Sequence, residues 1–237
     1  MVKISIVVPA YNEEATIIPL LRKVHAQKMD GFEFEVVVAD DGSVDSTLEL
    51  LQENADLYTK LLALPVNGGK GAAVVAALYE CTGDYVLFQD ADLEYDPDNY
   101  QQLLEPVIRF DADIVMGTRM AGSPLTRVSY FWHRMGNKFI TFVFNILNNT
   151  TFTDVYSCYL LYRRSLIGAQ ELKTRGWEQH AEILSLAVGR GLKIFEVPIS
   201  YYGRSYEDGK KIRAYHTFAV LLTMVVKKFS PKTPPPS

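Results

Sequence analysis

The sequence predicts an α/β fold with a mostly parallel sheet that helices cover on both faces. Short apolar runs rich in β-branched residues alternate with helical patterns along the first half of the chain. Such nearly all-apolar runs are typical of parallel strands that are buried on both faces. Polar residues follow three of the runs directly, at positions 12–13, 40–41 and 90–92. Because ligands bind beyond the carboxyl ends of the strands in such sheets, these positions indicate a binding site.

Each element of the first half has a local reason. A β-branched strand over 3–8 ends at Pro9, and a helical pattern covers 13–27. The next strand ends in a polar turn, after which Asp45 or Ser46 can cap a helix that runs through 53. A helix of small residues precedes the fourth strand. The predicted strands after the first cover 35–39, 60–64, 84–88 and 113–116, and the small-residue helix covers 71–80.

The second half of the chain is less regular. Helical patterns cover 128–147 and 178–188, and strand patterns cover 159–162 and 192–202. No repeat and no linker divides the chain, so we expect residues 1–230 to form a single domain that ends in a basic loop and an amphipathic helix over 203–230. The tail over 231–237 contains four prolines and is expected to be disordered.

Composition limits the functions that the chain can have. Its 237 residues are 48% hydrophobic and 22% charged, which suits one globular domain, and the net charge of −4 gives no general case for nucleic-acid binding. Cys81 and Cys158 lie in apolar settings without metal-like spacing, so both are expected to be reduced core residues, as in the cytosol. The chain enters a strand at once, so we expect no signal peptide, and its apolar run over 217–226 is too short to span a bilayer.

Asp90 and Asp92 come directly after a buried strand and are the strongest local signal of chemistry. Two carboxylates at i and i+2, where a strand gives way to a loop, can converge on one hard cation such as Mg²⁺ or Mn²⁺. The alternative is a solvated acidic turn that caps a helix, because Asp96 and Pro97 have the pattern of a helix start.

Two further motifs are candidate parts of the site. The turn Asp40-Asp41-Gly42-Ser43 ends the second strand, and taken alone it is better explained as a simple turn. The run Asn67-Gly68-Gly69-Lys70-Gly71 opens a helix, where backbone N–H groups and a lysine suit a diphosphate. It lacks the spacing of a Walker P-loop. The first strand is not followed by Gly-x-Gly-x-x-Gly, which argues against a dinucleotide-dependent dehydrogenase.

Taken in order, these motifs resemble the family-2 glycosyltransferases of GT-A fold. The resemblance covers residues 3 to 213 and looks most like the branch of dolichol- and polyprenyl-phosphate sugar synthases. Its motifs are the segments 8–14, 40–43, 67–71 and 90–92, followed by 117–119, 153–154 and 196–212.

The resemblance implies a donor site for a UDP- or GDP-linked sugar. In it, Pro9, Tyr11 and Glu13 line the nucleoside pocket, Asp40 contacts the base, and Asp41 and Lys70 lie near the ribose and phosphates. Mg²⁺ or Mn²⁺ is expected on Asp90 and Asp92, with Glu94 as a third ligand. The cation neutralises the departing diphosphate, and one inverting displacement gives a β product. Asp92, Arg119 and Asp154 are the residues assigned to catalysis.

The resemblance also implies a membrane lipid phosphate as acceptor, positioned by basic residues. Asp154 can act as a general base or orient an arginine. Glu182 lies on a helix that passes the same region in relatives, and His133 and His180 are expected to be structural. The acceptor-side basic residues are Arg119, Arg204 and Lys210, with Arg127 and Arg134 as further candidates.

Other readings of the sequence stay open. The acceptor can be a hydroxyl of a glycan or small molecule, and two departures from the family pattern, at Leu160 and at His216-Thr217, lie on the acceptor side. A sugar nucleotidyltransferase shares the sheet but usually has a glycine-rich loop after the first strand, which 9–12 lacks. A non-catalytic binder is the remaining class. From Gly203 onward the chain has seven basic residues and two acidic ones. A helix there either lies on the cytoplasmic face of an anionic membrane or packs on the domain, and a separate membrane subunit is a further partner to expect.

Overall fold

The computed structural model describes residues 1–120, 131–203 and 216–230, and its centre is a seven-stranded sheet. The strands occur in the spatial order β3-β2-β1-β4-β6-β5-β7. Every pair is parallel except those that involve β6, which runs antiparallel to β4 and to β5. The expected mostly parallel sheet is therefore confirmed. The strands are β1 (Val2–Ala10), β2 (Phe32–Asp40), β3 (Lys60–Ala63), β4 (Tyr85–Phe88), β5 (Ile114–Thr118), β6 (Leu160–Arg163) and β7 (Ile194–Pro198).

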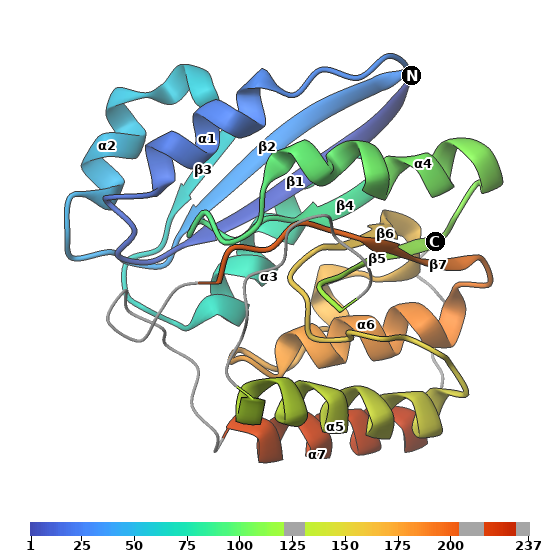
Figure 1. The fold of residues 1–237 in the computed structure, drawn as a ribbon. Coiled ribbons are helices and arrows are strands. Elements are labelled where there is room, and N and C mark those ends of the chain that lie inside the picture. Colours follow the sequence, from blue (N-terminus) through green and yellow to red (C-terminus); the bar gives the residue numbers. More distant parts are fainter. Residues whose placement is uncertain (121–130, 204–215, 231–237) are drawn as a thin grey trace.

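Helices cover both faces of this sheet. In Figure 1, α1, α2 and α4 lie on one side, α3 and α6 lie on the other, and α5 and α7 form a further layer beyond α6. The helices are α1 (Ile17–Ala26), α2 (Thr47–Glu53), α3 (Lys70–Glu80), α4 (Tyr100–Phe110), α5 (Phe131–Asn148), α6 (Gln179–Arg190) and α7 (His216–Phe229). Short 3-10 turns occur at Ala55–Leu57, Pro97–Asn99, Arg164–Leu166 and Ala169–Glu171. Within the described residues, none of the helices combines the length and apolarity needed to cross a bilayer.

Polar side chains fix where two of the helices begin. The carboxylate of Asp45 accepts a hydrogen bond from the backbone N–H of Thr47 at 3.0 Å, at the start of α2. Asp96 accepts from the backbone N–H of Asp98 at 3.3 Å, in the turn that leads into α4. The helix start at Asp96-Pro97 thus exists, and it lies four residues beyond Asp92, so it does not compete with the acidic motif for the same carboxylates.

The core is continuous between the sheet and its helices. The side chains of β4, most of those of β1, and those of β2 from Glu35 onward are buried, as their apolar runs predict. Cys81 and Cys158 are both buried and free, in agreement with their expected place in the core. Whether residues 1–230 act as one domain stays a prediction, and its basic loop and the tail over 231–237 lie outside the described residues.

One buried acid holds β1 to β2. Glu35 accepts hydrogen bonds from the hydroxyl of Ser5 at 2.5 Å and from the hydroxyl of Thr82 at 2.6 Å, and it pairs with Lys3 at 3.0 Å. Burial by itself would raise the pKa of Glu35, but these hydrogen bonds outweigh burial and lower the pKa to about 2. The carboxylate is therefore ionised in the folded protein at every ordinary pH.

Candidate active site

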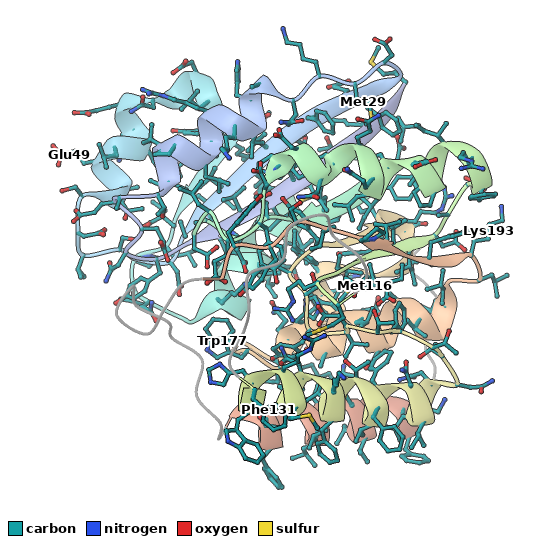
Figure 2. All side chains as sticks on the ribbon, in the orientation of Figure 1. Met29, Glu49, Met116, Phe131, Trp177 and Lys193 are labelled. Atoms are coloured by element: carbon teal, nitrogen blue, oxygen red, sulfur yellow. The ribbon has the colours of Figure 1, made fainter. Side chains whose placement is uncertain are left out.

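A cavity of about 790 Å³ lies beyond the carboxyl ends of β1, β2 and β4, where the sequence predicts a binding site. Its walls come from the start of α3, from the loop after β4, and from side chains of α5, α6 and α7. Figure 2 shows Trp177 in the space between α3 and the first turn of α5. The cavity therefore lies between the carboxyl ends of these strands and the helices α5, α6 and α7.

The loop after β1 supplies the first wall of this cavity. Pro9, Tyr11 and Glu13 all line it, as the resemblance predicts for a nucleoside pocket. Asn12 takes a left-handed φ of 51°, and its side-chain oxygen accepts a hydrogen bond from the backbone N–H of Val44 at 2.9 Å. This bond ties the loop after β1 to the loop after β2, which holds both at the cavity.

The two acids at the end of β2 have different environments. Asp40 is fully buried, and its carboxylate accepts hydrogen bonds from the backbone N–H and the hydroxyl of Ser43 at 3.1 and 2.5 Å. Asp40 does not line the cavity, in contrast to the expected contact with the base. Asp41 does line it, and its carboxylate accepts from the backbone N–H of Gly68 at 2.9 Å. The first acid therefore shapes the turn, and the second faces the ligand space.

The glycine-rich turn before α3 packs tightly against the loop before α6. The backbone N–H of Gly71 donates to the carbonyl of Arg175 at 2.8 Å, and a Cβ at position 71 would lie 2.5 Å from that carbonyl. Gly69 takes a φ of 89°, which favours glycine. These contacts aim Lys70, the first residue of α3, into the cavity, where its ammonium lies 5.6 Å from the centre of the Trp177 ring.

Asp90, Asp92 and Glu94 line the same cavity from the loop after β4. Leu93 takes a left-handed φ of 61°, which turns the loop back on itself. The backbone N–H of Glu94 donates to Asp92 at 3.1 Å, and the hydroxyl of Tyr201 donates to Glu94 at 2.7 Å. The turn therefore brings the three predicted metal ligands to one wall of the cavity.

Lys70 forms an ion pair with Asp90. Burial opposes both charges, but each charge outweighs that cost for the other, so the pKa of Lys70 is raised and the pKa of Asp90 is lowered. Both groups stay charged around neutral pH. Asp90 thus already holds one cation, supplied by the protein itself.

Asp90 and Asp92 fit a divalent cation as two ligands of an incomplete set. Among the residues that the structure describes, no group of three or more His, Cys, Asp or Glu side chains gathers as a ready-made metal site. Mg²⁺ is usually held by one or two carboxylates together with substrate phosphates and water. The carboxylate pair is therefore suited to a cation that arrives with a diphosphate.

Arg119 and Asp154 form a buried ion pair beside the cavity. Nε and Nη2 of Arg119 donate to the two carboxylate oxygens of Asp154 at 2.6 and 2.8 Å, and the backbone N–H of Arg119 adds a third bond at 3.1 Å. The guanidinium also lies 5.1 Å from the centre of the Tyr201 ring. Arg119 lines the cavity with 12% of its side chain exposed, whereas Asp154 is fully buried and does not line it. Of the two roles expected for Asp154, orienting an arginine is the one that this geometry provides.

The other predicted residues fall into four groups. Arg134 is exposed on α5 and does not line the cavity. Glu182 is fully buried, accepts hydrogen bonds from the backbone N–H groups of residues 173 and 174, and pairs with Lys227 of α7, so it holds structure together. His133 and His180 both line the cavity. Arg127, Arg204 and Lys210 lie outside the described residues.

His180 is neutral at physiological pH. Burial, reinforced by the nearby Lys70 charge, lowers its pKa to about 4. Its Nε2 atom is buried without a hydrogen-bond partner among the described residues. An uncharged ring with an unused polar atom at the cavity is a candidate contact for a sugar hydroxyl, although the sequence indicated a structural role.

The site also has an aromatic wall, which no sequence motif indicates as a unit. Trp177, Tyr156 and Tyr201 line the cavity beside Lys70 and Arg119. Tyr201 lies within the motif 196–212, and Trp177 follows a glycine just before α6. A glycine-aromatic pair at a helix start was the available signal for Trp177, but many such pairs only pack on a core.

Comparison with known proteins shows that most of the chain matches one protein family. The sequence profile of glycosyl transferase family 2 matches residues 5–169. A low-salt glycan biosynthesis hexosyltransferase, Agl6 of Haloferax volcanii, is 31% identical over 205 residues, which is 86% of this chain and 49% of the relative. The undecaprenyl-phosphate 4-deoxy-4-formamido-L-arabinose transferase of Pseudomonas aeruginosa is 31% identical over 212 residues, 87% of this chain and 60% of the relative. The chain thus spans only about half to three fifths of these curated relatives.

Solved structures share the fold. Glucosyl-3-phosphoglycerate synthase from Mycobacterium tuberculosis, in complex with Mn²⁺, UDP and phosphoglyceric acid, matches 97% of this chain and 80% of its own, with a TM-score of 0.70 at 21% identity. S. aureus TarS in complex with UDP-GlcNAc matches 97% of this chain and 68% of its own, with a TM-score of 0.63 at 18% identity. At these identities the likeness extends to the fold alone.

Proposed function

The chain belongs to glycosyl transferase family 2, and on that premise we propose that it is an inverting, metal-dependent hexosyltransferase. In this proposal it moves a sugar from a UDP- or GDP-linked donor to a polyprenyl phosphate at a membrane surface. One observation carries the proposal. A single cavity brings Asp90, Asp92, Lys70 and Arg119 together against side chains of α5 and α7.

The donor side follows from the acids and the lysine. The nucleoside lies against the loop that carries Pro9 and Tyr11, and the diphosphate lies at the start of α3, where backbone N–H groups favour anions. Mg²⁺ or Mn²⁺ on Asp90 and Asp92 would neutralise charge on the departing diphosphate. Lys70 keeps its charge and exchanges its partner, Asp90, for a phosphate oxygen when the donor binds.

The acceptor side follows from the buried ion pair. Asp154 fixes Arg119 through Nε and Nη2, so the guanidinium is held rigid at the cavity with Nη1 outside that pair. A planar, fixed guanidinium suits a phosphate, and the cost of ordering it has been met before the acceptor arrives.

A phosphate acceptor also explains why no base is needed at Asp154. A phosphate is already anionic near neutral pH and can attack the anomeric carbon without losing a proton to the enzyme. A hydroxyl acceptor needs a general base within reach of its proton, and the Asp154 carboxylate is fully buried in its pair with Arg119. The relative from Pseudomonas aeruginosa, by its name, acts on undecaprenyl phosphate.

The test has two stages. Thermal melting of the purified chain with Mn²⁺ and a panel of UDP- and GDP-sugars should single out one donor, since a ligand at a hundred times its Kd adds about 2.7 kcal/mol of stability. That donor, labelled in the sugar, is then offered polyprenyl phosphate in detergent. The expected product carries the label in the lipid phase.

Asp90→Ala/Asp92→Ala is the decisive variant, expected to lower kcat by about 10³-fold or more while the fold remains intact. Glu49→Ala is the matched control, because this exposed acid lies on α2 at the outer edge of the molecule (Figure 2). Full activity in the double variant, or under exhaustive chelation, would refute the proposed metal dependence. Transfer to a hydroxyl acceptor and not to polyprenyl phosphate would refute the proposed acceptor.

A further inference from the structure

Two helices of the outer layer expose an unusual amount of apolar surface. We define the α5–α7 face by its exposed large apolar side chains. These are Phe131, Trp132, Met135, Phe139, Phe142 and Ile146 on α5, and Phe218, Leu222, Val225, Val226 and Phe229 on α7. Contiguous apolar patches of this kind mark sites of interaction with a protein or a membrane.

The exposed side chains form one stripe along each helix. Apart from the adjacent pairs 131–132 and 225–226, they recur every three or four residues, which places them on a single side of the helix. The opposite sides are buried, at Ile140 and Phe144 of α5 and at Val220 and Met224 of α7. Both helices contact each other and α6 through these inner sides, and they form the outermost layer in Figure 1. Their apolar stripes therefore point away from the domain.

The charges of the same two helices are all of one sign. Neither α5 nor α7 contains an aspartate or a glutamate, although the whole chain has a net charge of −4. Arg134, Lys138 and Lys228 are exposed, whereas Lys227 is turned inward to Glu182. Exposed aromatic and aliphatic side chains among lysines and arginines are the pattern of helices that lie in the interface of an anionic bilayer. Two copies that met through this face would bring these like charges together.

The cavity is continuous with the α5–α7 face. Trp132 lines the cavity and is also 79% exposed, so it belongs to both surfaces. Ile140 of α5, Ile183 of α6 and Val220 of α7 supply apolar parts of the cavity wall. Trp132 and these apolar side chains therefore connect the outer face with the wall of the cavity that Arg119 also lines.

We propose that the α5–α7 face rests on an anionic bilayer and that a lipid acceptor enters the cavity past Trp132 without leaving the membrane. The inference rests on the proposed function for its acceptor, and it names the surface through which that acceptor arrives. The occupant of the face is the lipid itself, recognised by apolar insertion together with attraction of the exposed basic residues to lipid phosphates.

The test is co-sedimentation of the full chain with vesicles. We expect binding to vesicles that contain phosphatidylglycerol, weaker binding to pure phosphatidylcholine, and a fall in binding as salt rises. Phe139→Glu/Phe142→Glu should lower the partition coefficient by about tenfold or more, because two large side chains no longer insert. Ile108→Glu/Leu192→Glu is the matched control, since both side chains are exposed and lie outside the α5–α7 face.

The outcomes separate the surface from the reaction. If the chain transfers sugar to polyprenyl phosphate in detergent but does not bind vesicles, the membrane inference is overturned and the proposed function stands. If it stays off vesicles and dimerises through the same two phenylalanines, the face is a contact between copies, which also overturns the inference. If vesicles bind but neither a donor nor a lipid acceptor is used, the proposed function fails and the surface remains. Equal binding by the double variant and by its control would remove the α5–α7 face from the interaction.

Discussion

The change Asp154→Asn tests the Arg119–Asp154 pair directly. The substitution keeps the size of the side chain and removes its charge, so it leaves a guanidinium that is 12% exposed without its counter-ion. The Arg119 side chain loses two charge-assisted hydrogen bonds to the carboxylate, which have lengths of 2.6 and 2.8 Å in the native pair. Burial alone would raise the pKa of Asp154, yet the arginine outweighs burial and lowers the pKa, so the native pair is charged at neutral pH.

The magnitude follows from this burial. Removal of one partner from a buried ion pair costs about 3–5 kcal/mol, because the remaining charge stays uncompensated. The amide of asparagine can still accept one hydrogen bond, which favours the lower end, about 3 kcal/mol. For a chain of this length each kcal/mol shifts the melting temperature by about 2–4 °C. We therefore expect a fall of about 6–12 °C, accompanied by a loss of kcat/KM of about 10²-fold as Arg119 moves out of place.

The assay is thermal unfolding followed by circular dichroism, paired with initial rates at saturating donor. Asp111→Asn is the control, because this exposed acid also faces an arginine and a lysine, and exposed pairs contribute little to stability. A melting temperature for Asp154→Asn that matches the wild type, together with a large loss of kcat, would refute the reasoning. That result would mean that Asp154 acts on the substrate as a base and does not act through Arg119.

Three further changes test other parts of the structure. Gly71→Ala places a Cβ 2.5 Å from a backbone carbonyl, so it should lower the stability by about 1–3 kcal/mol and weaken the stabilisation by the donor. Gly189→Ala is the control, because Gly189 lies in α6 with open space around it, and this change should be neutral or add up to about 1 kcal/mol. Equal melting temperatures of the two variants would contradict this reasoning. Glu35→Gln should lower the free energy of unfolding by about 3 kcal/mol above pH 4.5, where the wild-type carboxylate is ionised in both the folded and the unfolded chain. The stability difference between wild type and variant should vanish as the pH falls towards the folded pKa of about 2. A constant difference in thermal melts across this pH range would contradict the argument. Lys227→Met leaves Glu182 buried without its ammonium partner, so it should lower the free energy of unfolding measured by urea titration by about 2 kcal/mol. An unchanged midpoint of the urea unfolding curve would mean that the pair is dispensable.

Much of the fold could be predicted because its strands are short, apolar and regularly interrupted. The runs that became β1, β2 and β4 are buried on both faces, which is the condition under which apolar pattern and strand coincide. The reversal of β6 could not be read from its residues, because a short strand inside a sheet that is covered on both faces is apolar whichever way it runs. Helix α4 was indicated only by its start at Asp96-Pro97, since Pro106 in its interior reads as a break. The last strand was predicted over 192–202 and covers only Ile194–Pro198.

The candidate site was predictable where short sequence motifs carry the chemistry. Asp90, Asp92 and Lys70 could be grouped because each follows or opens an element at the same edge of the sheet. The orientation of each side chain was beyond reach of the pattern, so the inward turn of Asp40 was not foreseen. Arg119 and Asp154 are 35 positions apart and meet only because β5 and β6 are neighbours.

Glu182 of α6 links α7 to the loop before α6, and this link has a consequence for cooperativity. Lys227 of α7 pairs with Glu182, and Glu182 accepts hydrogen bonds from the backbone of residues 173–174. In the same loop, the carbonyl of Arg175 accepts a hydrogen bond from the backbone N–H of Gly71, the residue after Lys70. If lipid holds α7 in place, it also steadies the turn that receives the diphosphate. Thermodynamic reciprocity then requires that the nucleotide sugar tighten adsorption to lipid by the same factor by which lipid tightens the nucleotide sugar. Titration of the donor with and without liposomes measures that factor, and a value of one would mean that the two ends of this chain of contacts are independent.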